Sequence, residues 1–163
     1  YTPNGYRLSP SANVMSDLQK FEKLWKQVQK DIPIPQKVHS LKHAIKLYKG
    51  HVLGAACDDH WIVGIATDYK MKYISMVNEL LSIFAEFEDY DAIHHFATQA
   101  LTLVPENVKA QYWLVYAIYH SSAVLLAKRE IEKAKIRLTS EEFDTLQKFI
   151  CKDESLPYGQ LFD

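Results

Sequence analysis

The chain has 163 residues, 48% of them hydrophobic and 24% charged, a balance typical of a globular domain with an apolar core. Its formal net charge of −1 gives no indication of a basic surface for nucleic acid. Five glycines and six prolines are too few for an all-β fold with many tight turns. No apolar run approaches the roughly 20 residues that span a bilayer, and the polar N-terminus lacks a signal-peptide core. Cys57 and Cys151 form no CxxC motif, so we expect free thiols and a cytoplasmic protein without membrane contact.

The first part of the chain predicts a non-helical start followed by two helices. Residues 1–15 contain Pro, Asn and Gly in a turn-like cluster, and a first residue other than Met makes us expect a piece of a longer protein. Ser16 is a good N-cap for the first helix, which the Pro-rich stretch 31–35 ends. A second helix is expected over residues 36–49, with Gly50 as its C-terminal stop.

Helical periodicity dominates the rest of the chain. Further helices are predicted at residues 61–88, 92–104, 108–120, 123–137 and 141–152. Asp58 or Asp59 would cap the first of these helices, Gly64 is a weak point within it, and Ser140 is expected to cap the last. Residues 153–163 are expected to form an irregular tail.

A repeat with a period near 34 residues, the length of a tetratricopeptide unit, runs through these helices. Its positions are Phe21, Leu24, Trp25, Val28, Ala44 and Tyr48 in the first unit, Val77, Leu80, Leu81, Phe84, Ile93, Ala97, Ala100 and Pro105 in the second, and Leu114, Val115, Ile118, Ala127, Ile131 and Ala134 in the third. Gln111 departs from the pattern at the opening position of the third unit.

A helix hairpin of this kind cannot bury its own apolar stripe, so each hairpin packs on the next. The repeat therefore predicts an all-α fold, a right-handed α–α superhelix of at least three tetratricopeptide-like hairpins. A generic helical bundle with accidental spacing is the alternative.

Two stretches carry a resemblance to a known family. They are Ala44-Ile-Lys-Leu-Tyr-Lys-Gly50-His-Val-Leu53, followed by an acidic loop and Trp61, and then Asp89-Tyr-Asp91 with Ala100-Leu-Thr-Leu-Val-Pro105-Glu-Asn107. Their order and spacing, from Ser16 to Ile150, resemble the bacterial transcriptional activator domain. This domain is the tetratricopeptide-like effector region of antibiotic-regulatory-protein (SARP) type and response-regulator transcription regulators. Gly5-Tyr-Arg-Leu8 is similar to the last wing strand of the winged-helix DNA-binding domain that precedes the repeats in this family.

The resemblance implies a winged-helix remnant plus linker at residues 1–15, the activator domain at residues 16–152 and a tail at residues 153–163. It implies a regulatory and protein-interaction module of a bacterial DNA-binding transcription activator, with DNA bound only through the missing N-terminal domain. A receiver domain of two-component signalling further upstream is compatible with the same similarity. Expected partners are the winged-helix domain, another subunit in a homodimer, or the transcription machinery. The alternative is a stand-alone tetratricopeptide adaptor that binds a peptide and has no link to DNA.

The sequence carries no pattern that indicates an enzyme, and we expect neither a cofactor nor a metal. His39 and His43 stand four residues apart on one predicted helix, but no nearby Cys or acid completes a ligand set. Cys57-Asp-Asp-His60 crowds ligand-type side chains into one loop, where adjacent residues rarely converge on one ion. Neither a nucleophile–base–acid motif nor a Gly-rich phosphate loop occurs in the sequence.

Aromatic residues gather on the predicted helix 108–120. The candidate residues of a partner groove are Tyr112, Trp113, Tyr116, Tyr119 and His120. The first helices of tetratricopeptide units line a concave groove, where large amphipathic rings suit the binding of a peptide or helix. The alternative is that these rings pack as core under the C-terminal helix and the tail, with Phe143, Phe149 or Tyr158.

Overall fold

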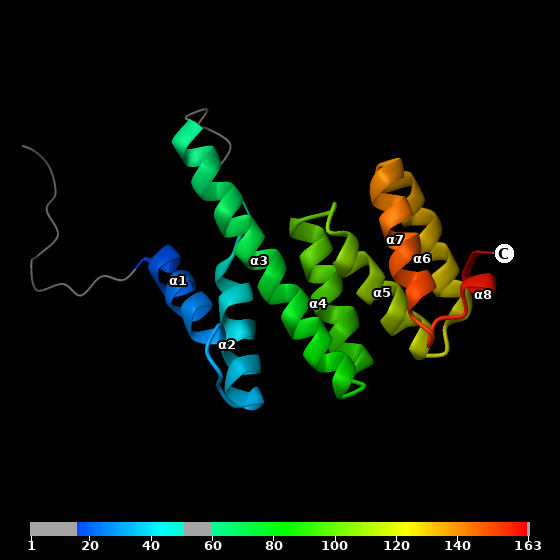
Figure 1. Cartoon of the computed structure of the whole chain (residues 1–163), viewed down its shortest axis with the longest axis horizontal. Coiled ribbons are helices and arrows are strands. Elements are labelled where there is room, and N and C mark those ends of the chain that lie inside the picture. The colour runs from blue at the N-terminus through cyan, green and yellow to red at the C-terminus, as the bar shows by residue number, and fades with distance from the viewer. Residues whose placement is uncertain (1–15, 51–59, 163) are drawn as a thin grey trace, which may run out of the picture.

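The computed structural model describes residues 16–50 and 60–162, without the side chains of His60 and Trp61. This part of the chain contains helices and no strand, which confirms the predicted all-α fold class. The helices stand side by side in a row, with α1 towards one end and α8 at the other (Figure 1). They are α1 (Asp17–Val28), α2 (Ile34–Leu47), α3 (His60–Glu86), α4 (Tyr90–Leu103), α5 (Val108–His120), α6 (Val124–Arg137), α7 (Ser140–Lys152) and α8 (Tyr158–Phe162).

The ends of α2 differ from the prediction by two residues. The helix begins at Ile34 because Pro35 fits into its first turn, where a missing N–H and a fixed φ do no harm. It ends at Leu47, with Tyr48 as the C-cap. Gly50 does adopt a positive φ of 100°, but it lies two residues beyond the cap. The prediction that Gly50 directly stops this helix is therefore wrong.

Capping boxes begin α1 and α7. The Ser16 hydroxyl accepts the backbone N–H of Gln19, whose side chain accepts the N–H of Ser16. At α7 the same reciprocal bonds join Thr139 and Glu142, so the predicted cap at Ser140 is wrong by one residue. Of the two neighbouring candidates, Thr139 has a glutamate three positions further on and Ser140 has Phe143, and a capping box requires Glu or Gln at that spacing.

The positions of the sequence repeat form the core. The buried members are Phe21, Val28, Ala44, Val77, Leu80, Leu81, Phe84, Ile93, Ala97, Ala100, Leu114, Val115, Ala127, Ile131 and Ala134. Each helix from α1 to α7 contacts the next one in the chain, and α5 also contacts α3 and α7. This is the packing expected of tetratricopeptide-like hairpins, in which alanines allow close approach of helices. The right-handed superhelical path stays a prediction.

The C-terminal tail is not irregular, contrary to the prediction. It contains the short helix α8 and places Leu156 and Leu161 in a second core cluster together with residues of α5, α6 and α7. The ring of Phe162 lies edge-on to that of Phe143, with centroids 6.4 Å apart. Because α8 also contacts α6, the tail covers the apolar end of the last hairpin, as terminal segments do in repeat folds.

The remaining sequence predictions concern the N-terminus and the region before and at the start of α3. The expected wing remnant at residues 1–15 and the loop 51–59, with Asp58 and Asp59 as candidate caps, lie outside the described residues. Gly64 does not interrupt α3. Among residues 16–50 and 60–162, no helix combines the length and the hydropathy that a membrane-spanning segment needs.

Candidate functional site

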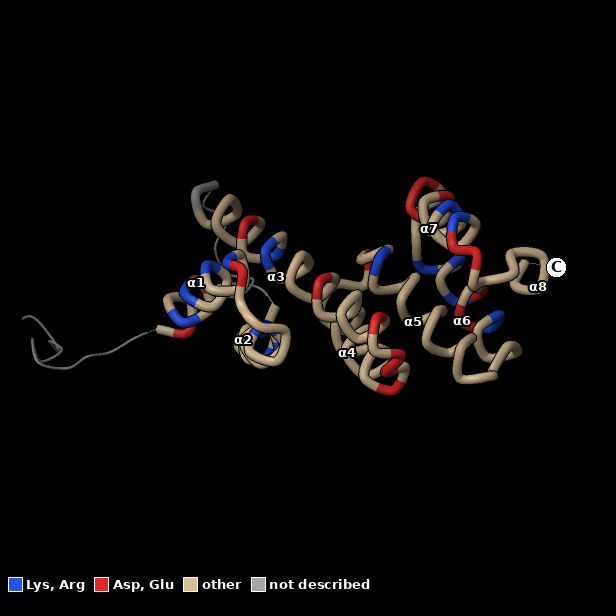
Figure 2. The backbone as a smooth tube through the Cα atoms, turned by 60° about the horizontal axis from the view of Figure 1, so that its bottom comes forward, with Lys and Arg blue, Asp and Glu red and all other residues tan. Residues whose placement is uncertain are grey.

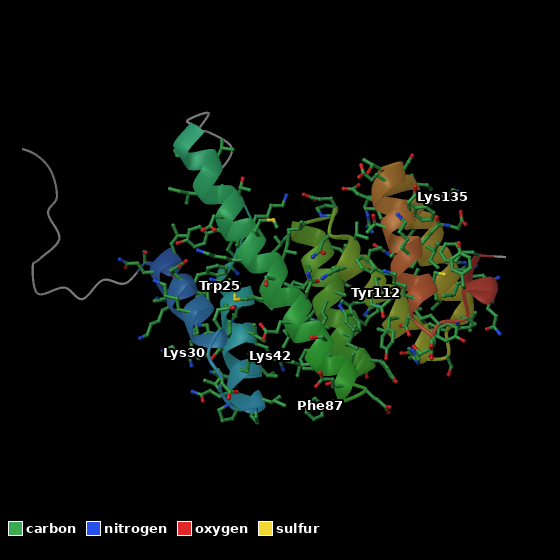
Figure 3. The ribbon with its side chains drawn as sticks, viewed as in Figure 1. Trp25, Lys30, Lys42, Phe87, Tyr112 and Lys135 are labelled. Atoms are coloured by element: carbon green, nitrogen blue, oxygen red, sulfur yellow. The ribbon has the colours of Figure 1, made fainter. Side chains whose placement is uncertain are left out.

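Two adjoining hollows, of about 430 and 410 Å³, lie along α3, α5 and α7. Tyr112, Trp113 and Phe149 line both hollows and therefore stand between them. The other lining residues are Ala85, Tyr116, Lys152, Asp153 and Ser155 in the first hollow, and Asn78, Glu79, Ser82 and Lys109 in the second. Figure 3 labels Tyr112 at this place, between the α3–α4 hairpin and α7. We refer to these residues as the α5 groove.

Three of the five predicted groove residues line the α5 groove. Tyr112, Trp113 and Tyr116 are half-buried. The ring of Trp113 is edge-on to both neighbours, with centroids 5.0 Å from Tyr112 and 5.3 Å from Tyr116. Tyr112 also approaches Phe149 of α7 at 6.1 Å. The buried residues of α1 to α5 form a first core cluster, and those of α5 to α8 form the second. Trp113 packs on the first cluster, Tyr112 on the second, and Tyr116 on both. These rings thus combine the two roles weighed from the sequence, since they support the core and line a surface hollow.

The other two predicted residues, Tyr119 and His120, lie against the tail and line neither hollow. The Tyr119 hydroxyl donates to Oε1 of Gln160 at 3.5 Å. His120 Nε2 is 3.1 Å from the Ser155 hydroxyl, and the imidazole stacks on the ring of Tyr90 at 5.2 Å. The structure therefore brings together only part of the predicted set.

A polar cluster fastens the tail to α5. Tyr112 Oη donates to Oδ2 of Asp153 at 2.6 Å, and Ser155 donates to Oδ1 from its hydroxyl and its N–H, at 2.7 and 3.0 Å. We refer to Tyr112, Asp153 and Ser155 as the tail clasp. Burial raises the pKa of Tyr112, and the bond to the carboxylate raises it further. Burial alone would raise the pKa of Asp153, but hydrogen bonds from Tyr112 and Ser155 lower it overall.

The acids of the α5 groove are paired with other groups, whereas its lysines are not. Both acids are engaged, since Glu79 lies 2.5 Å from Nζ of Lys37 and Asp153 belongs to the tail clasp. Lys109 and Lys152 form no ion pair with any described residue. The groove therefore offers aromatic rings flanked by two free ammonium groups, a combination that suits a partner with apolar side chains and carboxylates.

Sequence reasoning missed the polar half of the groove. Lys109, Lys152, Asp153 and Ser155 were not among the predicted residues. Tyr112 and Asp153 are 41 positions apart, so only the return of α7 and the tail onto α5 joins them. The one available signal was the suggestion that the aromatic helix packs under the C-terminal helix, which places that helix and its neighbours at the site.

The polar groups beside the groove do not form a catalytic triad. Ser155 contacts His120, but Asp153 binds Ser155 instead of orienting the imidazole, as the acid of a triad would. His39 and His43 are exposed on α2, and no group of three or more metal-ligating side chains occurs among residues 16–50 and 60–162.

A family model described as the bacterial transcriptional activator domain matches residues 16–145. The chain belongs to this family. It is therefore a module associated with bacterial transcriptional activation, and the family is a regulatory one rather than a family of enzymes. Searches of curated proteins and of solved structures returned no significant match. The matched segment ends within α7, so the groove residues Phe149, Lys152, Asp153 and Ser155 lie beyond it.

Proposed function

We propose that this activator domain is the regulatory and protein-interaction module of a DNA-binding transcription activator, and that its α5 groove binds a protein partner. The observation that carries the proposal is the row of half-buried rings between α3 and α7, which line two open hollows. Aromatic rings that are held by the core and still open to a surface hollow are typical of interaction sites. The family match supports the link to transcription and favours it over a stand-alone adaptor.

In this proposal the activator domain is one part of a longer transcription regulator. A preceding winged-helix domain would bind DNA, and a receiver domain would make the whole protein a response regulator. The occupant of the groove would then be the winged-helix domain, another subunit or the transcription machinery. The similarity of Gly5–Leu8 to a wing strand motivates this arrangement, and those residues lie outside the described part of the chain.

The chemistry of the groove specifies the kind of segment that it holds. Tyr112, Trp113 and Phe149 offer ring faces and edges to apolar side chains. Lys109 and Lys152 flank these rings and attract carboxylates. We therefore expect a peptide segment in which bulky apolar residues stand next to Asp or Glu.

Selection from a random peptide library displayed on phage tests this expectation, with the 163-residue chain as the target. Peptides that bind should combine aromatic or branched apolar residues with acids. Trp113→Ala should weaken the binding of a selected synthetic peptide about 30-fold, the equivalent of losing one hot-spot side chain of about 2 kcal/mol. Phe87→Ala is the matched control, because Phe87 is 63% exposed and lies outside both hollows.

A second variant separates binding from folding. Lys109→Glu/Lys152→Glu removes the positive charge without truncating a ring, and circular dichroism should show the helical content of the original chain. It should lower the affinity for acidic peptides at least about fivefold at low salt, since like charges then meet across the interface. Selected peptides that bind both variants as well as the original chain would show that the α5 groove is not the site.

A further inference from the structure

The net charge of −1 conceals a separation of charge along the row of helices. Residues 16–50, which form the α1–α2 hairpin, contain eight lysines and three acids. Residues 60–162 contain ten Lys and Arg against fourteen acids. Figure 2 shows basic positions concentrated on α1 and acidic ones gathered at the α4 end that joins α3. One end of this activator domain is therefore basic, although the whole chain is not.

The outer face of α2 carries the most uniform part of this charge. His39, Lys42, His43 and Lys46 follow the spacing i, i+3, i+4, i+7, which places them on one side of the helix. All four side chains are exposed, and exposed Lys49 follows just beyond the helix end. The opposite side of α2 is buried, and the helix contains no Asp or Glu. We refer to these five residues as the α2 basic stripe.

Neighbouring acids do not neutralise the lysines of this stripe. Within the hairpin, Asp17 pairs with Lys20 and Glu22 with Lys72 of α3. No ion pair with a described residue involves Lys42, Lys46 or Lys49. The Lys42 ammonium lies over the rings of Phe84 and Phe96, at 5.2 and 5.7 Å, which orients it and leaves its charge available.

We propose that the α2 basic stripe binds the phosphate backbone of duplex DNA. Lys42 to Lys49 spans roughly 10 Å along the chain, and a duplex presents one negative charge per about 1.7 Å of its axis, so each ammonium has a phosphate within reach. Lysine is typical of contacts to DNA phosphates and is depleted in the cores of protein interfaces. The stripe offers no exposed aromatic anchor that a protein partner would need.

This role goes beyond the proposed groove, because it uses different elements. The α2 basic stripe lies on the second helix of the first hairpin, whereas the α5 groove is built by α3, α5 and α7. The domain can therefore contact DNA and hold a protein partner at the same time. A contact to phosphates alone adds affinity without sequence specificity, so it would support the specific binding of another DNA-binding domain in the same protein.

The contact should be weak and dependent on salt. Three lysines that each neutralise a phosphate predict a slope of about −2.7 for log K against log salt, equivalent to about a 40-fold loss of affinity between 50 and 200 mM. Dissociation constants near physiological salt should fall in the range of about 1 to 100 μM that is typical of non-specific binding.

Fluorescence anisotropy with a labelled 20-base-pair duplex tests the proposal on the 163-residue chain. Lys42→Glu/Lys46→Glu/Lys49→Glu should weaken binding at least about tenfold at 50 mM salt and abolish most of the salt slope. The matched control is Lys133→Glu/Lys135→Glu/Lys148→Glu on α6 and α7, which changes the net charge equally at exposed positions. The affinity of this control for the duplex should stay within about threefold of that of the original chain, because α6 and α7 lie far from α2 along the row of helices (Figure 3).

The pair Lys46→Glu/Lys49→Glu leaves Lys42 on its two rings and keeps the test valid if the triple variant folds poorly. It should lose about two thirds of the salt slope. The proposal is overturned if the original chain shows no salt-dependent binding to the duplex, or if the stripe and control variants lose equal affinity for it. It is also overturned if poly-glutamate binds the stripe more tightly than duplex at equal charge concentration, since that result would assign the surface to an acidic protein.

Discussion

Tyr112 links three parts of the molecule through one side chain. Its ring stands between the two hollows and packs against the ring of Trp113, and its hydroxyl donates a hydrogen bond to Asp153 of the tail. A hydrogen bond to an ionised carboxylate is stronger than one between neutral groups. The tail clasp therefore connects the shape of the α5 groove to the protonation state of a single acid.

Tyr112→Phe should lower the free energy of unfolding by about 1 to 2 kcal/mol at pH 7, because it removes a hydrogen bond to a charged group that is partly exposed. The pKa of Asp153 is lowered in the folded chain. Its contribution is therefore present above the pKa of about 3.9 of an unfolded aspartate and is lost as the pH falls through the lower folded value. In urea unfolding between pH 7 and pH 3, the free energy of unfolding should fall less with decreasing pH in the variant than in the original chain.

Tyr158→Phe provides the control for this measurement. The Tyr158 hydroxyl accepts a bond from Gln147 at an exposed position, so its removal should change the unfolding free energy by less than about 0.5 kcal/mol. An equal loss in both variants, or an unchanged acid dependence in Tyr112→Phe, would show that the tail clasp contributes nothing particular.

The pairing of α5 with α6 depends on a residue that breaks the repeat pattern. Gln111 occupies a position where the repeat expects a large apolar side chain, and it is completely buried. Its amide oxygen accepts a bond from Arg137, and its amide nitrogen donates to Glu130 at 3.4 Å. The departure seen in the sequence is thus a polar bridge within one hairpin, in which both charged partners come from α6.

Two substitutions of Gln111 distinguish its volume from its hydrogen bonds. Gln111→Ala should cost about 2 kcal/mol or more, since it leaves a cavity in a closed site. Gln111→Leu should lower the free energy of unfolding by less than about 1 kcal/mol, because leucine fills the same space. Both former partners stay satisfied, since exposed Arg137 can bind water and Glu130 still pairs with Lys133. Thermal unfolding of both variants decides between the two causes. Equal losses would mean that the hydrogen bonds, rather than the volume, stabilise the hairpin.

At the scale of elements, the sequence predicted the helices well and their ends less well. α5 lies at its predicted bounds because Asn107 and the turn at Ser121 are local signals. The predicted start of α2 was late because Pro35 was interpreted as a breaker, although a proline in the first turn is compatible with a helix. α8 was missed because its stability comes from burying Leu156 and Leu161 against other helices, which no local pattern of five residues reveals.

The functional surfaces show the same division between local and distant information. The aromatic side of the α5 groove was visible as a periodic pattern on one helix. Its polar side was not visible, because it depends on a contact between residues that are 41 positions apart in the sequence. The α2 basic stripe could have been found, since a window of the first 35 described residues already shows the excess of lysine. Averaging charge over the whole chain concealed it.

The molecule as a whole is a row of hairpins with two core clusters that α5 connects. Residues of α1 to α5 form the first cluster and residues of α5 to α8 the second. In such a stack each unit contacts only its neighbours, so stability is a sum of local terms and the ends open more easily than the middle. The tail and its clasp lie at one end of this row, beside the α5 groove.

Two leucine truncations should reveal this gradient. Leu81 is fully buried in the first cluster, and Leu81→Ala should cost about 2 to 5 kcal/mol and lower the melting temperature by several degrees for the whole chain. Leu161 is 3% exposed in α8, and Leu161→Ala should cost less, because only the end of the row loses packing. Hydrogen exchange should then quicken in α7 and α8 while α3 and α4 stay protected. If exchange quickened equally along the row, the chain would open as a single unit, and the tail could not act on the α5 groove independently of the rest.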